Sequence, residues 1–452
     1  MLEFENLRKK YPEFVYKSYT VCRESDLLKV RYSFEITGLC EFNPEWSFPI
    51  PEKSPRIDSG LLNNLAFSLG LVELVSYWKA TCSPTVKVMP HALDGDMISW
   101  WKSLYFGGLG EFFYKNNIKT DKDSFMTVVT EGIPLKPSAP LELSGNLVPV
   151  GGGKDSAVTL RILKGEKENT LPYIINSRGA TDMTCEVSGY GSDAYRVRRT
   201  IDKKLIDLNQ KGFLNGHTPF SAIVAFSSLI SACLNGKKYV VLSNESSANE
   251  STVLGEDINH QFSKGVEFEA NFIRYQQKYI NCGVEYFSLL RPLSEMQIAA
   301  LFARYDEFHS VFRSCNAGSK KDIWCCSCPK CLFVYIILSP FLSQEKLIEI
   351  FGENLLDKEV LLDTYKELLG VLPNKPFECV GSRDEVITAS FVTLSKLKEI
   401  GAKLPKLLDY FEENVTNAPF KMTYYLNYFD ENNYLPQHFL KLLQSELEEN
   451  LK

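Results

Sequence analysis

The chain has 452 residues, 44% of them hydrophobic and 12% aromatic, so it can bury substantial cores and form two or three domains. Its formal net charge is −6 and its pI is near 5.7, with Lys and Arg scattered along the sequence, so we expect no nucleic-acid partner. The first residues lack the pattern of a signal peptide, and the best apolar runs, at 221–234 and 331–342, are too short to cross a membrane. These features predict a cytoplasmic protein without a membrane partner.

Residues 1–145 mix predicted strands and helices and are expected to form an α+β module, a candidate substrate-binding domain. The run at 30–36 alternates like a half-exposed strand, whereas residues 61–77 are apolar at helical spacing. Trp100 and Trp101 lie in a strongly apolar stretch, where core packing is favoured over stacking on a uracil ring. The proline-rich residues 133–140 predict a linker and a domain boundary near residue 145.

The most informative motif follows a short apolar strand and consists of Gly151, Gly152, Gly153, Lys154, Asp155 and Ser156. Three glycines allow a tight turn whose N–H groups point inward. The Ser156 hydroxyl and the start of a helix predicted at 157–163 add donors and a positive dipole for an anion. Neither the Walker A spacing nor the dinucleotide fingerprint fits this segment. We interpret it as a phosphate-binding loop.

Strands and helices alternate from residue 146 to about residue 340. Strands are predicted at 147–150, 172–176 and 239–243, and an apolar helix at 222–234. This alternation predicts an α/β domain with a parallel sheet covered on both faces and the phosphate loop at its carboxyl edge. Glu245 follows the strand at 239–243, so its carboxylate would stand over the same crevice as a base or a metal ligand.

Four of the twelve cysteines cluster in the sequence, namely Cys315, Cys325, Cys328 and Cys331. The last three have the spacing C-x₂-C-x₂-C, and Cys315 adds a fourth thiolate at loop distance, a natural tetrahedral set for structural zinc. An iron–sulfur cluster is a variant of this reading. The alternatives are a redox or sulfur-carrying pair, in which Cys326 could also serve, and unpaired buried thiols.

The chain after residue 340 is predicted to be mostly helical, so that residues 341–452 form a helical C-terminal region. Amphipathic spacing recurs at 344–351, 358–369, 384–397 and 436–451.

Three resemblances add to this interpretation. The glycine loop resembles the PP-loop of ATP pyrophosphatases, in which a Ser-Gly-Gly-x-Asp-Ser turn grips the β,γ-pyrophosphate of ATP, although Gly151 stands where that family usually has Ser. The cysteines resemble the zinc site of 7-cyano-7-deazaguanine synthases, with a first gap one residue longer. A longer likeness, to the MurL family of UDP-N-acetylmuramoyl-L-alanyl-L-glutamate epimerases, spans nearly the whole chain through motifs at 98–111, 150–156, 244–250, 259–264, 285–295, 324–333 and 375–381.

The MurL resemblance implies an adenine nucleotide α hydrolase-like domain and an epimerase. Such an enzyme inverts the terminal L-Glu of UDP-MurNAc-L-Ala-L-Glu to D-Glu in peptidoglycan synthesis. It consumes ATP, with Mg²⁺, and releases AMP and diphosphate. We expect the glycine loop and Lys154 to hold the pyrophosphate, and Asp155 to position it or a bound Mg²⁺.

The epimerising base is less well defined by the sequence. Glu245 is one candidate. His260 is another, because it alone among the histidines lies in a polar, loop-like cluster near candidate site residues, although a single histidine is often structural. Weaker candidates are Glu250, Lys264, Arg291 and Glu295; Arg291 could clamp a substrate carboxylate or form a surface ion pair. The basic run of Arg196, Arg198 and Arg199 is either a solvated helix face or a binding site for the diphosphate of a nucleotide sugar.

Two other functions remain open at this point. One is a PP-loop enzyme that adenylates a nucleobase or tRNA, as in nitrile formation or thiolation, but the acidic composition argues against a tRNA partner. The other is a non-catalytic nucleotide sensor, which the missing serine at Gly151 favours and the intact Asp155 and Ser156 oppose.

Overall fold

A computed structural model describes residues 4–253, 255, 258–417 and 419–451. Its strands are β1 (Glu13–Glu24), β2 (Leu27–Ile36), β3 (Cys40–Phe42), β4 (Glu45–Pro49), β5 (Thr85–Val88), β6 (Thr127–Thr130), β7 (Asn146–Pro149), β8 (Thr170–Ile175), β9 (Tyr195–Thr200), β10 (Tyr239–Leu242) and β11 (Glu285–Ser288). Within the described residues these eleven strands form one sheet in the order β11-β10-β7-β8-β9-β4-β2-β1-β5-β6, with β3 paired to β2.

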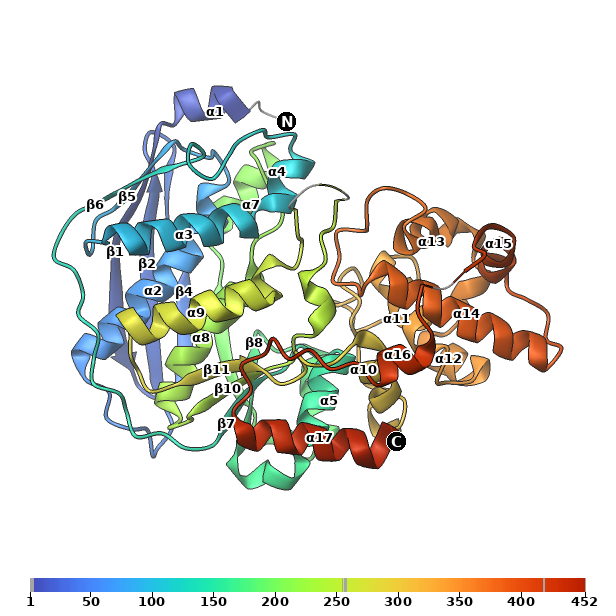
Figure 1. Ribbon diagram of the computed structural model, residues 1–452. Coiled ribbons are helices and arrows are strands. Elements are labelled where there is room, and N and C mark those ends of the chain that lie inside the picture. The colour runs from blue at the N-terminus through green and yellow to red at the C-terminus, as the bar shows by residue number, and fades with distance from the viewer. Residues whose placement is uncertain (1–3, 254, 256–257, 418, 452) are drawn as a thin grey trace.

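Helices pack against this sheet, and the C-terminal ones extend to one side of it (Figure 1). They are α1 (Phe4–Lys10), α2 (Ser59–Trp78), α3 (Gly95–Gly108), α4 (Gly110–Lys115), α5 (Lys154–Ile162), α6 (Gly179–Val187), α7 (Lys203–Gln210), α8 (Phe220–Leu234), α9 (Val266–Tyr279), α10 (Glu295–Phe302), α11 (Pro329–Leu338), α12 (Gln344–Phe351), α13 (Leu362–Leu369), α14 (Arg383–Glu399), α15 (Lys406–Asn414), α16 (Met422–Leu426) and α17 (Gln437–Leu451).

The half of the sheet from β11 to β9 is parallel and is covered on both faces. Successive side chains of a strand point to opposite faces, so a strand that is apolar at consecutive positions can fill two cores. In β7, Leu147 packs into a core shared with α2 and α8, while Val148 packs into a second core with α5 and α10. The predicted α/β class is confirmed.

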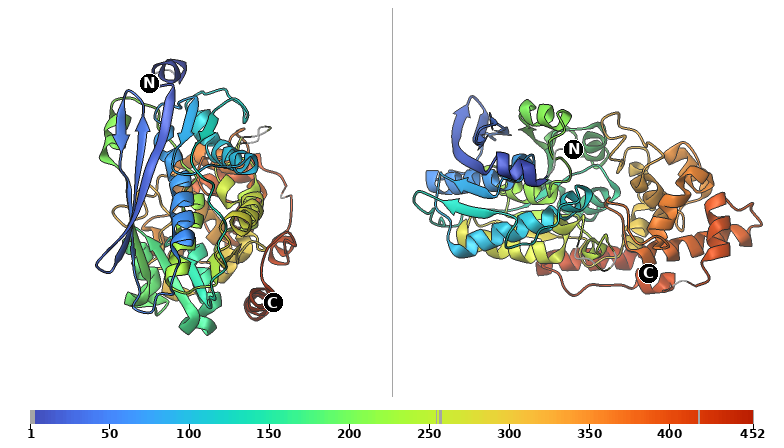
Figure 2. Two further views of the ribbon diagram at one scale, coloured as in Figure 1. Left: turned by 90° about the vertical axis from the view of Figure 1, so that its left-hand side faces the viewer. Right: turned by 90° about the horizontal axis from the view of Figure 1, so that it is seen from above.

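The other half of the sheet contains the long antiparallel strands β1 and β2. Along the whole of β2, buried and half-buried residues alternate, as the sequence pattern predicts for a strand with one covered face. The buried side chains Val30, Tyr32 and Phe34 join the core that contains α2. Figure 2 shows the helices gathered on one side of these strands.

The two halves meet where β4 pairs with β9, with Trp46 opposite Arg199. The sheet therefore runs from the first 145 residues into the α/β segment without a break. The predicted linker lies in residues 131–145, which form no helix or strand. The division of the chain at residues 145 and 340 stays a prediction.

The C-terminal part is helical, as predicted. Helix α12 coincides with its predicted range, and α14 and α17 start or end within two residues of theirs. Helix α13 begins four residues later than predicted, because two short 3₁₀ turns precede it. Helix α17 returns to the sheet, where the Phe439 ring lies 5.0 Å from Tyr239 and 4.7 Å from Phe287.

Helix α2 is a longer apolar segment than the two runs that the sequence analysis compared with a membrane span. It is long and apolar enough, by length and composition, to cross a membrane, whereas the runs at 221–234 and 331–342 are not. In this structure 78% of its most apolar window is buried, packed against the sheet and α8. Its hydropathy is explained by its place in the core, because a helix that is apolar all round can be buried on every side.

Candidate active site

The phosphate loop connects β7 to α5. Gly152 has φ +79°, and a Cβ there would lie 2.9 Å from the backbone of Ala180 and Thr181. A Cβ on Gly153 would lie 2.8 Å from the Ser314 hydroxyl. Position 152 therefore requires glycine, because its backbone conformation and the nearby backbone leave no room for a Cβ, whereas a side chain at Gly153 would only displace the Ser314 hydroxyl.

The helix after the loop begins earlier than the sequence predicted. Gly153 is the N-cap of α5, which starts at Lys154 and not at residue 157. Lys154, Asp155 and Ser156 thus occupy the first turn, where backbone N–H groups have no partner within the helix. Gly151 is exposed and precedes this turn. The arrangement suits an anion at the helix N-terminus.

The loop also lies at a topological switch point of the sheet. From β7 the chain continues to β8 and β9 on one side, whereas β10 and β11 lie on the other side. In open α/β sheets ligands bind where the strand order reverses, beyond the carboxyl ends of the strands. Glu245 follows β10 and so stands at the same point as the loop that follows β7.

The Lys154 ammonium group is buried among carboxylates. Its Nζ contacts Asp155 and lies 2.5 Å from the Glu295 carboxylate. Burial alone would lower the pKa of Lys154, but the surrounding carboxylates outweigh it and raise the pKa. Glu295 shows the opposite balance, since burial raises its pKa to about 7 even though Lys154 lies beside it.

Glu245 is buried and acts electrostatically on Lys154. Its carbonyl oxygen accepts a bond of 2.5 Å from Arg291, while its Oε2 has no hydrogen-bond partner among the described residues. Arg291 is itself fully buried and forms an ion pair of 2.9 Å with Glu269. Arg291 therefore supports the loop that carries Glu245, which corrects the expectation of a substrate clamp or a surface ion pair.

A second polar cluster surrounds His260. Its Nδ1 lies 2.5 Å from the Glu111 carboxylate, which also lies 3.4 Å from His217 and 2.5 Å from Lys115. Burial alone would lower the pKa of His260, but bonds to Cys379 and Glu111 raise it to about 9. Burial lowers the pKa of His217 to about 3, so this second imidazole stays neutral.

Cys379 is the member of this cluster that sequence analysis did not single out. The His260 and Lys264 side chains both hydrogen-bond its thiol. Burial opposes ionisation of Cys379, but Lys264, His260 and Lys330 outweigh it and lower the pKa to about 6. Glu111 and His217 were missed as well, because each comes from a segment far away in sequence.

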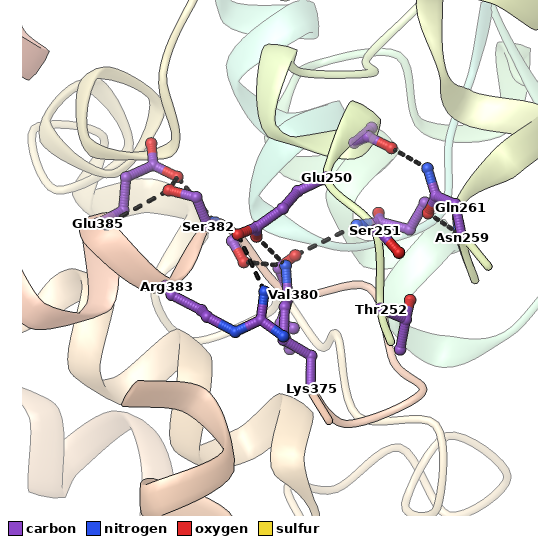
Figure 3. A network of polar contacts seen from close by, with 12 residues as sticks. Glu250, Ser251, Thr252, Asn259, Gln261, Lys375, Val380, Ser382, Arg383 and Glu385 are labelled. Atoms are coloured by element: carbon purple, nitrogen blue, oxygen red, sulfur yellow. Dashed lines mark hydrogen bonds and ion pairs between the residues drawn. The ribbon is translucent and has the colours of Figure 1, made fainter. Parts of the chain in front are cut away.

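Figure 3 shows the polar network that joins the loop after β10 to the segment before α14. Glu250 contacts Lys375 and lies 3.3 Å from Arg383. Gln261 donates to the Val380 carbonyl at 3.1 Å, and Lys375 donates to the Gly381 carbonyl at 2.8 Å. These bonds hold residues 375–383 against the loop that bears His260.

The two polar clusters are neighbours. Lys264 interacts electrostatically with Asp155 and Glu245 and also with Cys379. A Cβ on Gly381, two residues after Cys379, would lie 3.0 Å from the Glu295 Cγ. The phosphate loop and the His260 cluster therefore belong to one site.

A cavity of about 1110 Å³ opens beside this site. Its walls come from α3, α4 and residues 249–267, and it includes Asn259 next to His260. Lys119 and Lys122 line the same cavity.

The four predicted zinc ligands come together. The sulfur of Cys328 lies 3.8 Å from Cys315 and 3.5 Å from Cys331, and the sulfurs of Cys325 and Cys331 are 3.7 Å apart. A tetrahedron with Zn–S bonds of about 2.3 Å has edges of about 3.8 Å, so the set fits zinc. All twelve cysteines are free of disulfides. The Cys326 sulfur instead contacts the Phe351 carbonyl at 3.1 Å.

The remaining candidates, the arginine run and the tryptophans, contribute to the fold. The arginine run lies on strand β9 and not on a helix: Arg199 pairs with buried Glu73 at 2.7 Å, and Arg196 pairs with Asp182 at 2.9 Å. Trp101 is buried in the core, as favoured from the sequence.

Comparison with known proteins agrees with the predicted resemblance. Residues 5–289 match the MurL N-terminal domain and residues 308–418 match the MurL C-terminal domain. The UDP-N-acetyl-alpha-D-muramoyl-L-alanyl-L-glutamate epimerase of Micromonospora sp. is 36% identical over 410 residues, which is 87% of this chain and 88% of that protein. The enzyme of the same name from Salinispora tropica is 36% identical over 78% of this chain and 78% of that protein. The one from Xanthomonas oryzae pv. oryzae is 36% identical over 73% of this chain and 74% of that protein. No solved structure matches. The chain belongs to the MurL family.

Proposed function

We propose that this protein is an ATP-dependent epimerase. It converts the terminal L-Glu of UDP-MurNAc-L-Ala-L-Glu to D-Glu through an acyl-adenylate and releases AMP and diphosphate in peptidoglycan synthesis. The names of its relatives support the UDP-MurNAc-dipeptide as the substrate and epimerisation as the reaction. The observation that carries the ATP-dependent part is the glycine loop at the switch point, which leads into the buried Lys154 and its carboxylate neighbours.

Adenylation gives this inversion a physical reason. The α-hydrogen of a glutamate carboxylate is very weakly acidic, because the carbanion would form beside a negative charge. In the proposed reaction a carboxylate oxygen attacks the α-phosphorus of ATP, the bond to the β-phosphate breaks, and diphosphate leaves. The mixed anhydride then allows a side-chain base to remove the α-proton, an acid returns a proton to the opposite face of Cα, and water finally releases the product and AMP.

The roles of the loop residues follow from their positions. The N–H groups of the first turn of α5 are suited to a pyrophosphate at the helix N-terminus, and the buried Lys154 ammonium, which pairs with Asp155 and Glu295, adds positive charge next to it. Asp155, Glu245 and Glu295 provide carboxylates around it, and the unpartnered Oε2 of Glu245 suits a hard cation. When bound, Mg²⁺ supplies neutralising charge to the phosphates.

The cavity beside His260 suits the remainder of the substrate. It is large, it opens between α3, α4 and the loop after β10, and Lys119 and Lys122 are suited to an anionic nucleotide sugar. We assign the four-cysteine cluster to a structural zinc, because four thiolates leave no open position for catalysis.

The test is to incubate the purified protein with ATP, Mg²⁺ and UDP-MurNAc-L-Ala-L-Glu. AMP, diphosphate and the chirality of the glutamate recovered after hydrolysis are then measured. We expect D-glutamate together with AMP and diphosphate, and no AMP when the dipeptide substrate is omitted. Asp155→Ala should abolish diphosphate release. A folded, ATP-binding protein that forms neither AMP nor D-glutamate would overturn the proposal.

A further inference from the structure

Cys379 lies between the two polar clusters, on a segment whose backbone carbonyl groups accept hydrogen bonds from neighbouring side chains. The segment lies between α13 and α14, and Lys330 donates to the Cys379 carbonyl oxygen. Gln261 and Lys375 bond the carbonyls of the next two residues. These bonds fix the backbone of the segment that carries the thiol. As a residue, Cys379 is half-buried.

We propose that Cys379 is the general base that removes the α-proton of the adenylated glutamate, with His260 and Glu111 as positioning residues. This assignment rests on the proposed function and adds to it the identity of the base.

The position of Cys379 beside the adenylation site supports this role. Lys264 hydrogen-bonds the thiol and interacts electrostatically with Asp155 in the phosphate loop and with Glu245 at the switch point. Gly381, two residues further on, is packed against Glu295, which is 2.5 Å from Lys154. A carboxyl group that reaches the α-phosphate over the loop would bring its Cα near the Cys379 segment, since this segment packs against Glu295 beside Lys154.

The local charges keep the thiol ready to accept a proton. With a pKa of about 6, Cys379 is mostly thiolate at neutral pH, whereas an ordinary cysteine is mostly protonated. His260, with a pKa of about 9, is then the imidazolium partner. Glu111 contacts Nδ1 of this ring, which leaves Nε2 as the nitrogen that can face the sulfur.

The step balances as a proton transfer. The Cα–H bond breaks and an S–H bond forms on Cys379, while the electron pair of the broken bond is delocalised into the acyl-adenylate carbonyl. Water in the site supplies a proton to the opposite face of Cα, which gives the D configuration, and the Cys379 proton then returns to solvent. The phosphate loop takes no part in this step, so adenylation and proton removal depend on different side chains.

That separation defines the experiment. Cys379→Ala and Cys379→Ser are compared with wild type and with Cys40→Ser, a matched control on strand β3. The reactions are run in D₂O with ATP, Mg²⁺ and the UDP-MurNAc-dipeptide, and AMP, D-glutamate and deuterium at Cα are measured. We expect both Cys379 variants to lose at least about 100-fold in D-glutamate formation and deuterium uptake, while AMP formation is retained. Cys40→Ser should behave like wild type.

Each other outcome has a distinct meaning. Wild-type protein that forms no AMP and no D-glutamate overturns the proposed function and this role with it. Wild-type activity combined with full D-glutamate formation by Cys379→Ala overturns the role of Cys379 alone. If the variants stay folded by thermal melting but lose AMP formation as well, the thiol is needed for adenylation and is not the base.

The positioning residues have their own readout. In His260→Gln, the pH at which Cys379 is alkylated by iodoacetamide should rise from about 6 towards the ordinary thiol value of about 8.5. Glu111→Gln should shift it in the same direction by a smaller amount. An unchanged alkylation profile in both variants would overturn their assignment.

Discussion

Two neighbouring glycines in the loop after β7 carry different constraints, although both belong to the motif that predicts phosphate binding. Gly152 combines a positive φ with a close approach to the backbone of Ala180 and Thr181. Gly151 is exposed, with no atom within 4 Å of an added Cβ. Glycine is therefore a structural requirement at position 152 and not at position 151. A serine at position 151, as in the PP-loop pattern, would fit this chain.

Gly152→Ala should therefore abolish AMP formation, because the added Cβ forces the loop away from the conformation that cradles an anion. Gly151→Ser is the matched control and should keep AMP formation within a few-fold of wild type. The measurement is initial-rate AMP release at saturating ATP, with thermal melting to verify folding. Equal loss in both variants would show that the loop tolerates no side chain at either position, contrary to this geometry.

Cys379 predicts a particular pH dependence. Lys264, His260 and Lys330 are the charged groups that face it, and they hold its pKa at about 6. Since only the thiolate can accept the α-proton, kcat/KM for deuterium uptake should rise as pH increases through about 6. It should fall above about 9, where His260 loses its proton and its bond to the thiolate weakens. A profile measured in parallel with AMP formation checks this, and a rate that stays constant from below pH 6 to above pH 9 would contradict it.

At the scale of elements, the alternation of apolar strands and helices was sufficient to predict the parallel half of the sheet and the position of Glu245 after β10. Local spacing also predicted the four cysteines that meet around one point. Sequence patterns could not reveal the pairing of β4 with β9, because a strand pattern specifies its faces and not its neighbour. The cluster of Glu111, His260 and Cys379 was hidden for a similar reason, since its members come from α4, the loop after β10 and the segment before α14.

The cysteine cluster braces both halves of the candidate site. Arg313, two residues before Cys315, donates to the Gly152 carbonyl at 2.7 Å, and Asn316 donates to the Glu378 carboxylate at 2.6 Å. The same short segment thus supports the phosphate loop and the neighbour of Cys379. A bound zinc would fix this segment and, through it, the spacing between the two groups.

Cys325→Ser should consequently lower the zinc content from about one ion per chain, lower the melting temperature by several degrees and reduce AMP formation. Cys326→Ser is the matched control, since its sulfur contacts a carbonyl of α12 and lies outside the four-sulfur set. Elemental analysis, thermal melting and AMP release are measured on the same preparations. Wild-type protein that is fully active but free of zinc would contradict the assignment.

At the scale of the whole molecule, the continuous sheet joins the N-terminal module to the loop-bearing segment through the pairing of β4 with β9. The buried ion pair between Arg199 on β9 and Glu73 on α2 crosses this junction. Arg199 Nε and Nη2 donate to the Glu73 carboxylate at 2.7 to 3.1 Å, and the Trp46 indole donates to it at 3.3 Å. A buried pair of this kind is costly to break, because the remaining charge is left without a partner.

Arg199→Ala should lower the free energy of unfolding by about 3–5 kcal/mol, because Glu73 would stay buried and unpaired. Arg198→Ala, at the exposed neighbouring position of the same strand, should change it by less than about 0.5 kcal/mol. Urea unfolding is followed by tryptophan fluorescence and by AMP formation at each urea concentration. If the sheet is one unit, both signals should shift together in Arg199→Ala, since the strand that loses its ion pair is hydrogen-bonded through β8 to β7, which leads into the phosphate loop. A fluorescence shift that leaves the activity transition in place would mean that the N-terminal module unfolds independently of the active site.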